Sequence, residues 1–265
     1  MIAEAMRLSP SIAHVLLTRS PWHALQRHRL GGGMESEPTD ATRRGYLIES
    51  MLIGGGKDIV VVDAKDWRTN LAKDARAAAE AAGKVAVLAE KFEQATGAVG
   101  LLRERLIADG HSLAGSPQLT IEWESDGAAC KGKLDVWNSA HLLITDLKTC
   151  DDASDEAVSR SIVNYGADIQ HAAYIEGVEA TGISEPGRTR FQFVHVEPDY
   201  GVVVVRTLSG TLAELGARKW ARAKRIWRRC IETGVWPAYE SRPIEAAPWH
   251  LAAEEMRTAK ETEDQ

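Results

Sequence analysis

The hydrophobic pattern of the chain has a helical period at both ends and a strand period in the middle. In the first 110 residues, apolar positions recur at the spacing of amphipathic helices, and Ala, Lys and Glu are frequent. Ser20-Pro21 and the glycines from Gly54 divide this region, because such residues start and end helices. We expect helices over residues 8–30 in two pieces, over residues 39–53, and over residues 67–109 with a break at Gly83.

Residues 118–207 alternate between apolar and polar side chains in short runs that are rich in β-branched and aromatic residues. Asp126-Gly127 is a favourable hairpin turn between two of these runs. We expect strands over residues 118–124, 130–137, 142–148, 190–197 and 201–207, with helices over residues 153–177 and 210–233. The sequence therefore predicts an α/β fold with a helical N-terminal portion and one central sheet.

Composition restricts the class, location and domain organisation of the protein only slightly. The chain has 265 residues and a formal net charge of −6, and it contains no apolar run long enough to cross a membrane. Its three widely spaced cysteines favour a reducing, cytoplasmic location over a disulfide scaffold. We expect a single domain over residues 1–240 and an acidic, partly frayed tail over residues 241–265.

The chemistry of the sequence is concentrated on two neighbouring predicted strands. Asp146 and Lys148 are two residues apart and therefore lie on one face, and Asp135 can lie beside them if the two strands pair. Two carboxylates with carbonyls and waters suit Mg²⁺, or alternatively Mn²⁺, and such a site with a nearby ammonium can hydrolyse phosphodiesters. An exposed hairpin with an ordinary Asp–Lys ion pair is an equally good interpretation of these three residues alone.

The helix expected after these strands supports the first interpretation. Gln170 and Tyr174 are four residues apart, so they share one helical face with the small residues Ala167 and Gly177. Small residues allow this helix to approach the sheet closely. Polar side chains on a packing face then indicate a role at a site, although a buried tyrosine with a satisfied hydroxyl group is the simpler alternative.

The order Asp135, Asp146-Leu147-Lys148, Gln170 and Tyr174 resembles the PD-(D/E)xK nuclease superfamily, in its branch with a trailing Q-x-x-x-Y motif. Within that branch the chain is similar to RecE-like phage exonucleases of the exodeoxyribonuclease VIII type. Further similar segments are residues 8–21, 45–52, 121–123 and 230–239. The resemblance implies a restriction-endonuclease-like core with a central mixed sheet flanked by helices.

The resemblance also implies roles for the motif residues. Asp135 and Asp146 would be metal ligands, Leu147 would offer its backbone carbonyl group to the metal, and Lys148 would position or activate the attacking water. Gln170 and Tyr174 would line the site.

The resemblance implies one further metal ligand, at a position where this sequence differs from its relatives. Glu49 falls where many relatives have a metal-binding histidine, and a carboxylate is also a good Mg²⁺ ligand. Gln118 stands where relatives often have glutamate, which argues against a role for its strand. The three scattered cysteines cannot hold the four-cysteine iron–sulfur cluster of Cas4-like nucleases.

Basic residues are unevenly distributed and suggest where DNA could bind. A late helix carries arginines at helical spacing, opposite an apolar stripe that we expect to be core, and this basic face either follows phosphates or is simply solvated. Related phage exonucleases hold a terminal 5′-phosphate with an Arg and a Ser near the N-terminus. The candidates are Arg218, Arg222, Arg225 and Arg229 on the helix, and the pairs Arg7 with Ser9 and Arg19 with Ser20.

The function implied by the resemblance is a Mg²⁺-dependent 5′-to-3′ exonuclease on double-stranded DNA ends. Such enzymes serve phage-type recombination with a single-strand annealing recombinase, and many form rings of identical subunits. A RecB- or Cas4-like nuclease for single strands or flaps is one alternative. A DNA-binding protein with a nuclease fold and no activity is the other, although the intact Asp135, Asp146 and Lys148 argue against it.

Overall fold

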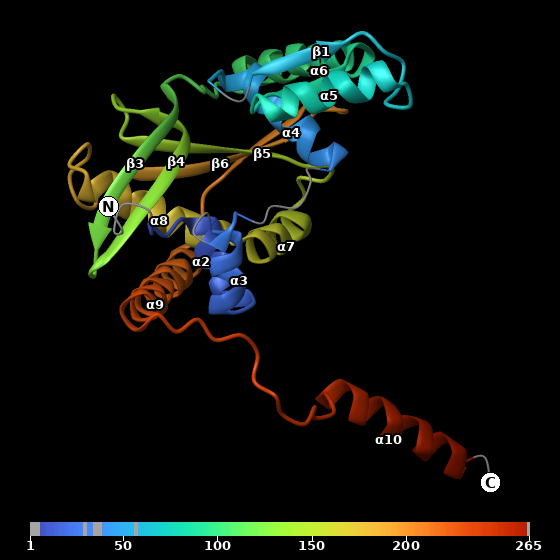
Figure 1. Ribbon diagram of the computed structural model, residues 1–265, viewed down its shortest axis with the longest axis vertical. Coiled ribbons are helices and arrows are strands. Elements are labelled where there is room, and N and C mark those ends of the chain that lie inside the picture. The colour runs from blue at the N-terminus through green and yellow to red at the C-terminus, as the bar shows by residue number, and fades with distance from the viewer. Residues whose placement is uncertain (1–5, 29–30, 34–38, 56–57, 264–265) are drawn as a thin grey trace.

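A five-stranded mixed sheet forms the centre of the protein (Figure 1), which we describe from a computed structural model for residues 6–28, 31–33, 39–55 and 58–263. The strand order is β3-β4-β5-β6-β7, and only β5 and β6 run parallel. The strands are β3 (Ser116–Ser125), β4 (Ala128–Asn138), β5 (Leu143–Thr149), β6 (Arg190–Glu197) and β7 (Val202–Arg206). All five predicted strands are confirmed, as is the turn at Asp126-Gly127, where both residues have positive φ.

Helices cover both faces of this sheet. One face packs on the N-terminal and late helices α2 (Pro10–Thr18), α3 (Pro21–Arg27), α7 (Asp155–Tyr165), α8 (Ala167–Ala180) and α9 (Gly210–Thr233). The other face packs on α4 (Asp40–Ile53) and α6 (Ala89–Ala108). Ser20 caps α3 and Pro21 begins it, as the sequence predicts. The mixed α/β architecture with flanking helices agrees with the expected fold class.

A second, two-stranded sheet corrects the prediction for residues 67–109. The parallel strands β1 (Ile59–Val62) and β2 (Val85–Leu88) pair beside the helix α5 (Asn70–Ala81). The hydrophobic pattern predicts no strand over residues 59–62 and predicts helix over residues 85–88. Val85 and Val87 are buried against α4 and α6, so packing overrides the helical composition of the surrounding segment.

The helix expected over residues 153–177 is two helices. Gly166 ends α7 in the left-handed conformation, with φ of 71°, and α8 starts at the next residue. A Cβ at Gly166 would lie 2.5 Å from Nδ1 of His14, so the bend also lets α2 approach closely. Glycine is needed here for both reasons.

The C-terminal tail is helical where we expected fraying. Residues Pro248–Glu263 form α10, which extends away from the rest of the protein after an extended segment (Figure 1). Its described side chains are largely solvent exposed, as a polar tail should be. None of the described helices has the length and apolar character that crossing a bilayer requires.

Candidate active site

The candidate site lies where β4 and β5 separate. The two strands pair only over residues 136–138 and 143–145, whereas the opposite half of β4 is bridged by Leu8 of the N-terminal segment. Just beyond the last pair, Oδ2 of Asp135 accepts a hydrogen bond of 2.9 Å from the backbone N–H of Leu147. A carboxylate thus takes the place of a backbone acceptor and is fixed beside β5.

Asp146 and Lys148 extend from β5 toward α8 and meet Gln170. Lys148 Nζ contacts Oδ1 of the fully buried Asp146. Gln170 connects the pair, because its Nε2 donates to Asp146 Oδ2 at 2.6 Å and its Oε1 accepts from Lys148 Nζ at 3.1 Å. The same Nε2 lies 3.3 Å from the hydroxyl group of Tyr174. The four predicted residues form one hydrogen-bonded group.

Close packing of α8 on the sheet positions Gln170 and Tyr174. A Cβ at Gly132 of β4 would lie 2.8 Å from Cε1 of Tyr174. A Cβ at Gly177 would lie 2.6 Å from Cδ1 of Ile121 on β3. Each distance is shorter than a carbon–carbon contact allows, so the absence of a side chain at both glycines lets α8 approach β3 and β4.

The site contains more buried carboxyl groups than its one close ammonium group can keep ionised. Burial raises the pKa of Asp135 to about 8, and repulsion from Asp146 adds to the rise. Burial also raises the pKa of Asp146, although Lys148 opposes it. For Lys148, burial acts to lower the pKa, but the carboxylates of Asp146 and Asp135 outweigh it and the pKa is raised. Lys148 is therefore protonated at neutral pH.

Glu49 on α4 is the third carboxylate of the site. Burial raises its pKa, and Asp146 and Lys148 are among the charges that act on it. Gln118 holds it in place, because Nε2 of Gln118 donates to Oε1 of Glu49 at 2.7 Å. The sequence argued against a role for the strand that carries Gln118, and the structure adds that Gln118, with a φ of 54° on β3, contacts a candidate ligand.

Comparison with known proteins supports the family and the fold of the chain. Residues 16–241 match the family described as "PDDEXK-like domain of unknown function (DUF3799)". The chain belongs to this family. A crystal structure of a proposed exonuclease from Eubacterium rectale is similar over 92% of both chains, with a TM-score of 0.60 and 16% identity, which supports the PDDEXK-like fold.

A second solved structure, a phage related exonuclease from Haemophilus somnus 129PT, aligns over 71% of this chain and 95% of its own. Its TM-score is 0.34 and its identity 14%, so we draw no argument from it. No curated protein sequence matches the chain.

The donor set of the PDDEXK-like domain fits a hard divalent cation. Among the described residues, no three His, Cys, Asp or Glu side chains converge closely enough to hold an ion by themselves. An ion at this place would therefore be held by Asp135, Asp146, the carbonyl group of Leu147 and water, because the predicted ligand Glu49 does not converge with the two aspartates as a third carboxylate. A cation at this place would favour the ionised form of the two buried carboxyl groups and so oppose the rise in pKa that burial causes.

A cavity of about 500 Å³ opens beside Gln170 and Tyr174. Ser9 lines it from the start of α2, where its hydroxyl group lies 3.1 Å from that of Ser11. The bridge from Leu8 to β4 brings this segment to the site. The remaining lining residues are Pro10, Thr120, Lys131, Gly132, Lys133, Tyr165 and Gly166.

Lys131 and Lys133 are candidates that the sequence interpretation missed. They lie two residues apart on β4, shortly before Asp135, and both line the cavity. The period of the strand was the available signal, because it places both ammonium groups on the same side. Two lysines and two serine hydroxyl groups beside the carboxylates can bind phosphate oxygens of a DNA strand.

The other N-terminal candidates for DNA binding either make different contacts or lie elsewhere. Nε of Arg7 lies 3.1 Å from Oε2 of Glu122, so its charge is already paired. Arg19 is exposed at the far end of α2 from Ser9. Ser20 is buried, accepts from the backbone N–H of His23 and lies 2.7 Å from its Nδ1, so its hydroxyl group is used in capping α3.

The basic face of α9 is exposed but lies away from the carboxylates. Trp220, Ala223 and Trp227 are buried against α8 and α2, as predicted for the apolar stripe. The opposite face therefore points away from α8, whose other side carries Gln170. It presents the four predicted arginines, Arg218, Arg222, Arg225 and Arg229, to solvent.

Proposed function

We propose that the protein is a metal-dependent deoxyribonuclease that degrades double-stranded DNA from its ends in the 5′-to-3′ direction. The observation that carries this proposal is the hydrogen-bonded group of Asp146, Lys148 and Gln170, with Asp135 held beside it, in a PDDEXK-like domain. The group combines carboxylates, an ammonium group and an adjoining basic cavity, which are the parts that phosphodiester hydrolysis needs.

Each residue has a defined task in this mechanism. Asp135 and Asp146 would hold Mg²⁺, or Mn²⁺, which when bound offsets the carboxylate charge and polarises the phosphate. Lys148 carries a proton that can hydrogen-bond an attacking water or a phosphate oxygen. Gln170 fixes the Lys148 ammonium group against Asp146, and Tyr174 supports Gln170 through its hydroxyl group.

The cavity beside the candidate active site supports a role in binding the end of a DNA strand. Ser9, Ser11, Lys131 and Lys133 would hold the phosphates next to the bond that is cleaved. The α9 arginines would follow the duplex at longer range, where their effect depends on salt. We further propose that the exposed 3′ strand passes to an annealing recombinase and that several subunits enclose the duplex.

Nuclease assays on end-labelled linear, circular and single-stranded DNA with Mg²⁺ test the proposal. The test variants are Asp146→Asn and Lys148→Met. The matched control is Lys219→Met, because Lys219 forms a similar pair with the buried Asp168 on the α9 side of α8. The lysine side chains of the two pairs are 34% and 32% exposed, and both aspartates are fully buried.

Loss of linear-duplex degradation in both test variants, with activity kept in Lys219→Met, is the expected result. Degradation of circular duplex would contradict the requirement for an end. A preference for single strands would favour the RecB- or Cas4-like alternative. No degradation of any substrate with Mg²⁺ or Mn²⁺ would favour a DNA-binding protein without activity.

A further inference from the structure

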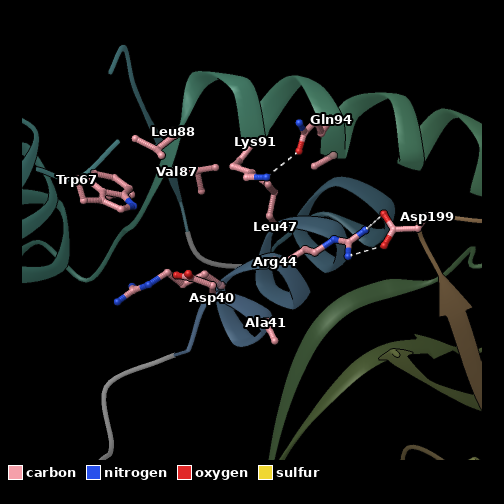
Figure 2. Close-up of a pocket in the computed structure, with 13 residues that line it drawn as sticks. Asp40, Ala41, Arg44, Leu47, Trp67, Val87, Leu88, Lys91, Gln94 and Asp199 are labelled. Atoms are coloured by element: carbon pink, nitrogen blue, oxygen red, sulfur yellow. Dashed lines mark hydrogen bonds and ion pairs between the residues drawn. The ribbon is translucent and has the colours of Figure 1, made fainter. Parts of the chain in front are cut away.

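A second cavity, of about 600 Å³, lies between the small sheet and the central one (Figure 2). It is enclosed by the first half of α4, by β2 and the start of α6, by the segment before α5 and by the turn between β6 and β7. Neither Glu49 nor the carboxylates of β4 and β5 line it, so it is separate from the candidate active site. Its volume falls in the range of small-ligand sites.

The cavity has an apolar middle and an aromatic end. Leu47, Val87 and Ala95 supply apolar surface from α4, β2 and α6. Trp67 lines the end that Figure 2 shows beside Leu88. The guanidinium carbon of Arg76 lies 5.5 Å from the centre of the indole ring, which orients the ring. The indole is half-buried, and the part of it that lines the cavity can stack on a flat heteroaromatic ring.

Positive charge gathers on the same cavity. Arg44 pairs with Asp199 across one end, whereas the hydrogen bond of 3.0 Å from Lys91 Nζ goes to the neutral amide of Gln94. Within the described residues, Lys91 has no carboxylate partner within ion-pair distance. The N-cap of α6 is Leu88, which supplies no side-chain acceptor, so the positive end of this helix also lies at the cavity.

We propose that this cavity binds a nucleotide, with its base against Trp67 and its phosphate group between Lys91 and Arg44. The aromatic end suits the base, the apolar middle suits the sugar, and Lys91, whose hydrogen bond goes to a neutral amide, supplies positive charge together with the α6 terminus. Asp40, which also lines the cavity, can accept hydrogen bonds from the amino group of a base. This site does not depend on the proposed nuclease activity.

Two sources share this chemistry: a free nucleoside monophosphate, or one nucleotide of a single DNA strand. Isothermal titration calorimetry in buffer with a metal chelator tests both, because hydrolysis is then suppressed. The probes are the four deoxynucleoside 5′-monophosphates and a phosphorothioate single strand. Saturation by a monophosphate identifies a free nucleotide, and saturation by the strand alone identifies a strand nucleotide. Either result supports the proposal if variants of the residues that line the cavity weaken the binding.

The variants make the assignment to this cavity specific. We expect Trp67→Ala and Lys91→Glu each to weaken binding about tenfold or more, and Trp67→Phe to restore most of it, because stacking needs only an aromatic ring. Trp249→Ala and Lys73→Glu are matched controls at exposed positions outside the cavity, and they should bind like the original protein. Thermal melting verifies that each variant is folded.

Absence of saturable binding to every probe would overturn the proposal. Binding that both Trp67→Ala and Lys91→Glu leave unchanged would do so as well, because the ligand would then occupy another site. The binding assay requires neither metal nor cleavage, and its variants lie outside the candidate active site, so a failure of the nuclease assay and a failure of this proposal are distinguishable.

Discussion

Gly132→Ala tests whether the position of Tyr174 controls the candidate active site. The new Cβ would lie 2.8 Å from Cε1 of Tyr174. Since carbon atoms in contact are about 3.5 Å apart, the ring must move by about 0.7 Å. The ring is buried, and its hydroxyl group lies 3.3 Å from Nε2 of Gln170, so Gln170 should shift against Asp146 and Lys148.

Two measurements separate the expected effects. Overpacking should lower the free energy of unfolding by about 1–3 kcal/mol in urea titrations. A displacement of this size should also lower nuclease activity, assayed on linear duplex well below the melting temperature, by about ten- to hundredfold.

Gly177→Ala is the matched control. Its Cβ would meet Ile121 and Trp123 at 2.6 and 2.8 Å, at the same α8–sheet interface but against side chains of β3 and not against a motif residue. We expect a similar loss of stability with much less loss of activity. Equal activity losses in the two variants would refute the reasoning, because overpacking of the helix alone would then explain both.

Three further predictions concern the metal, pH and the core. Mg²⁺ at about a hundred times its dissociation constant should stabilise the folded protein by about 2.7 kcal/mol in thermal or urea unfolding, and Asp146→Asn should lose this effect; an equal effect in the variant would contradict the metal assignment. Burial lowers the pKa of His195 from 6.5 to about 4, so the unfolded state binds more protons between these values and stability is lost as pH falls through them. His195→Gln should remove at most about 3 kcal/mol of the stability difference between pH 7 and 4, and an unchanged difference would count against a buried neutral imidazole. Lys224 is 2% exposed and lies 2.7 Å from Glu176 and from Asp126, so Lys224→Met should cost about 3 kcal/mol or more in urea unfolding; a neutral result would show that the pair is dispensable.

The sequence was most informative where local pattern and local geometry agree. The strand β4 alternates between buried and more exposed residues over most of its length, and the Asp126-Gly127 turn has the positive φ values that this dipeptide favours. The motif residues are two positions apart on β5 and four positions apart on α8, and each spacing, which can be seen directly in the sequence, places a pair on one face.

Other features depend on contacts that no local pattern reveals. The strands β1 and β2 have four residues each and lie among helix formers, so their pairing is a tertiary effect. The bend at Gly166 follows from the close approach of His14, about 150 positions away in the chain. The contact between Gln118 and Glu49 joins residues 69 positions apart and accompanies a positive φ at Gln118.

The closure of the N-terminal segment onto the rest of the domain has a consequence for biosynthesis. Leu8 bridges to β4, and the indole of Trp227 on α9 donates to the backbone carbonyl of Met6 at 2.9 Å. The first contact joins positions 122 apart in the sequence and the second joins positions 221 apart. The segment that carries Ser9 can therefore pair with β4 early, but its second anchor forms only after α9 has been synthesised. A nascent chain thus has its carboxylates on β4 and β5 before this wall of the cavity is held from both sides.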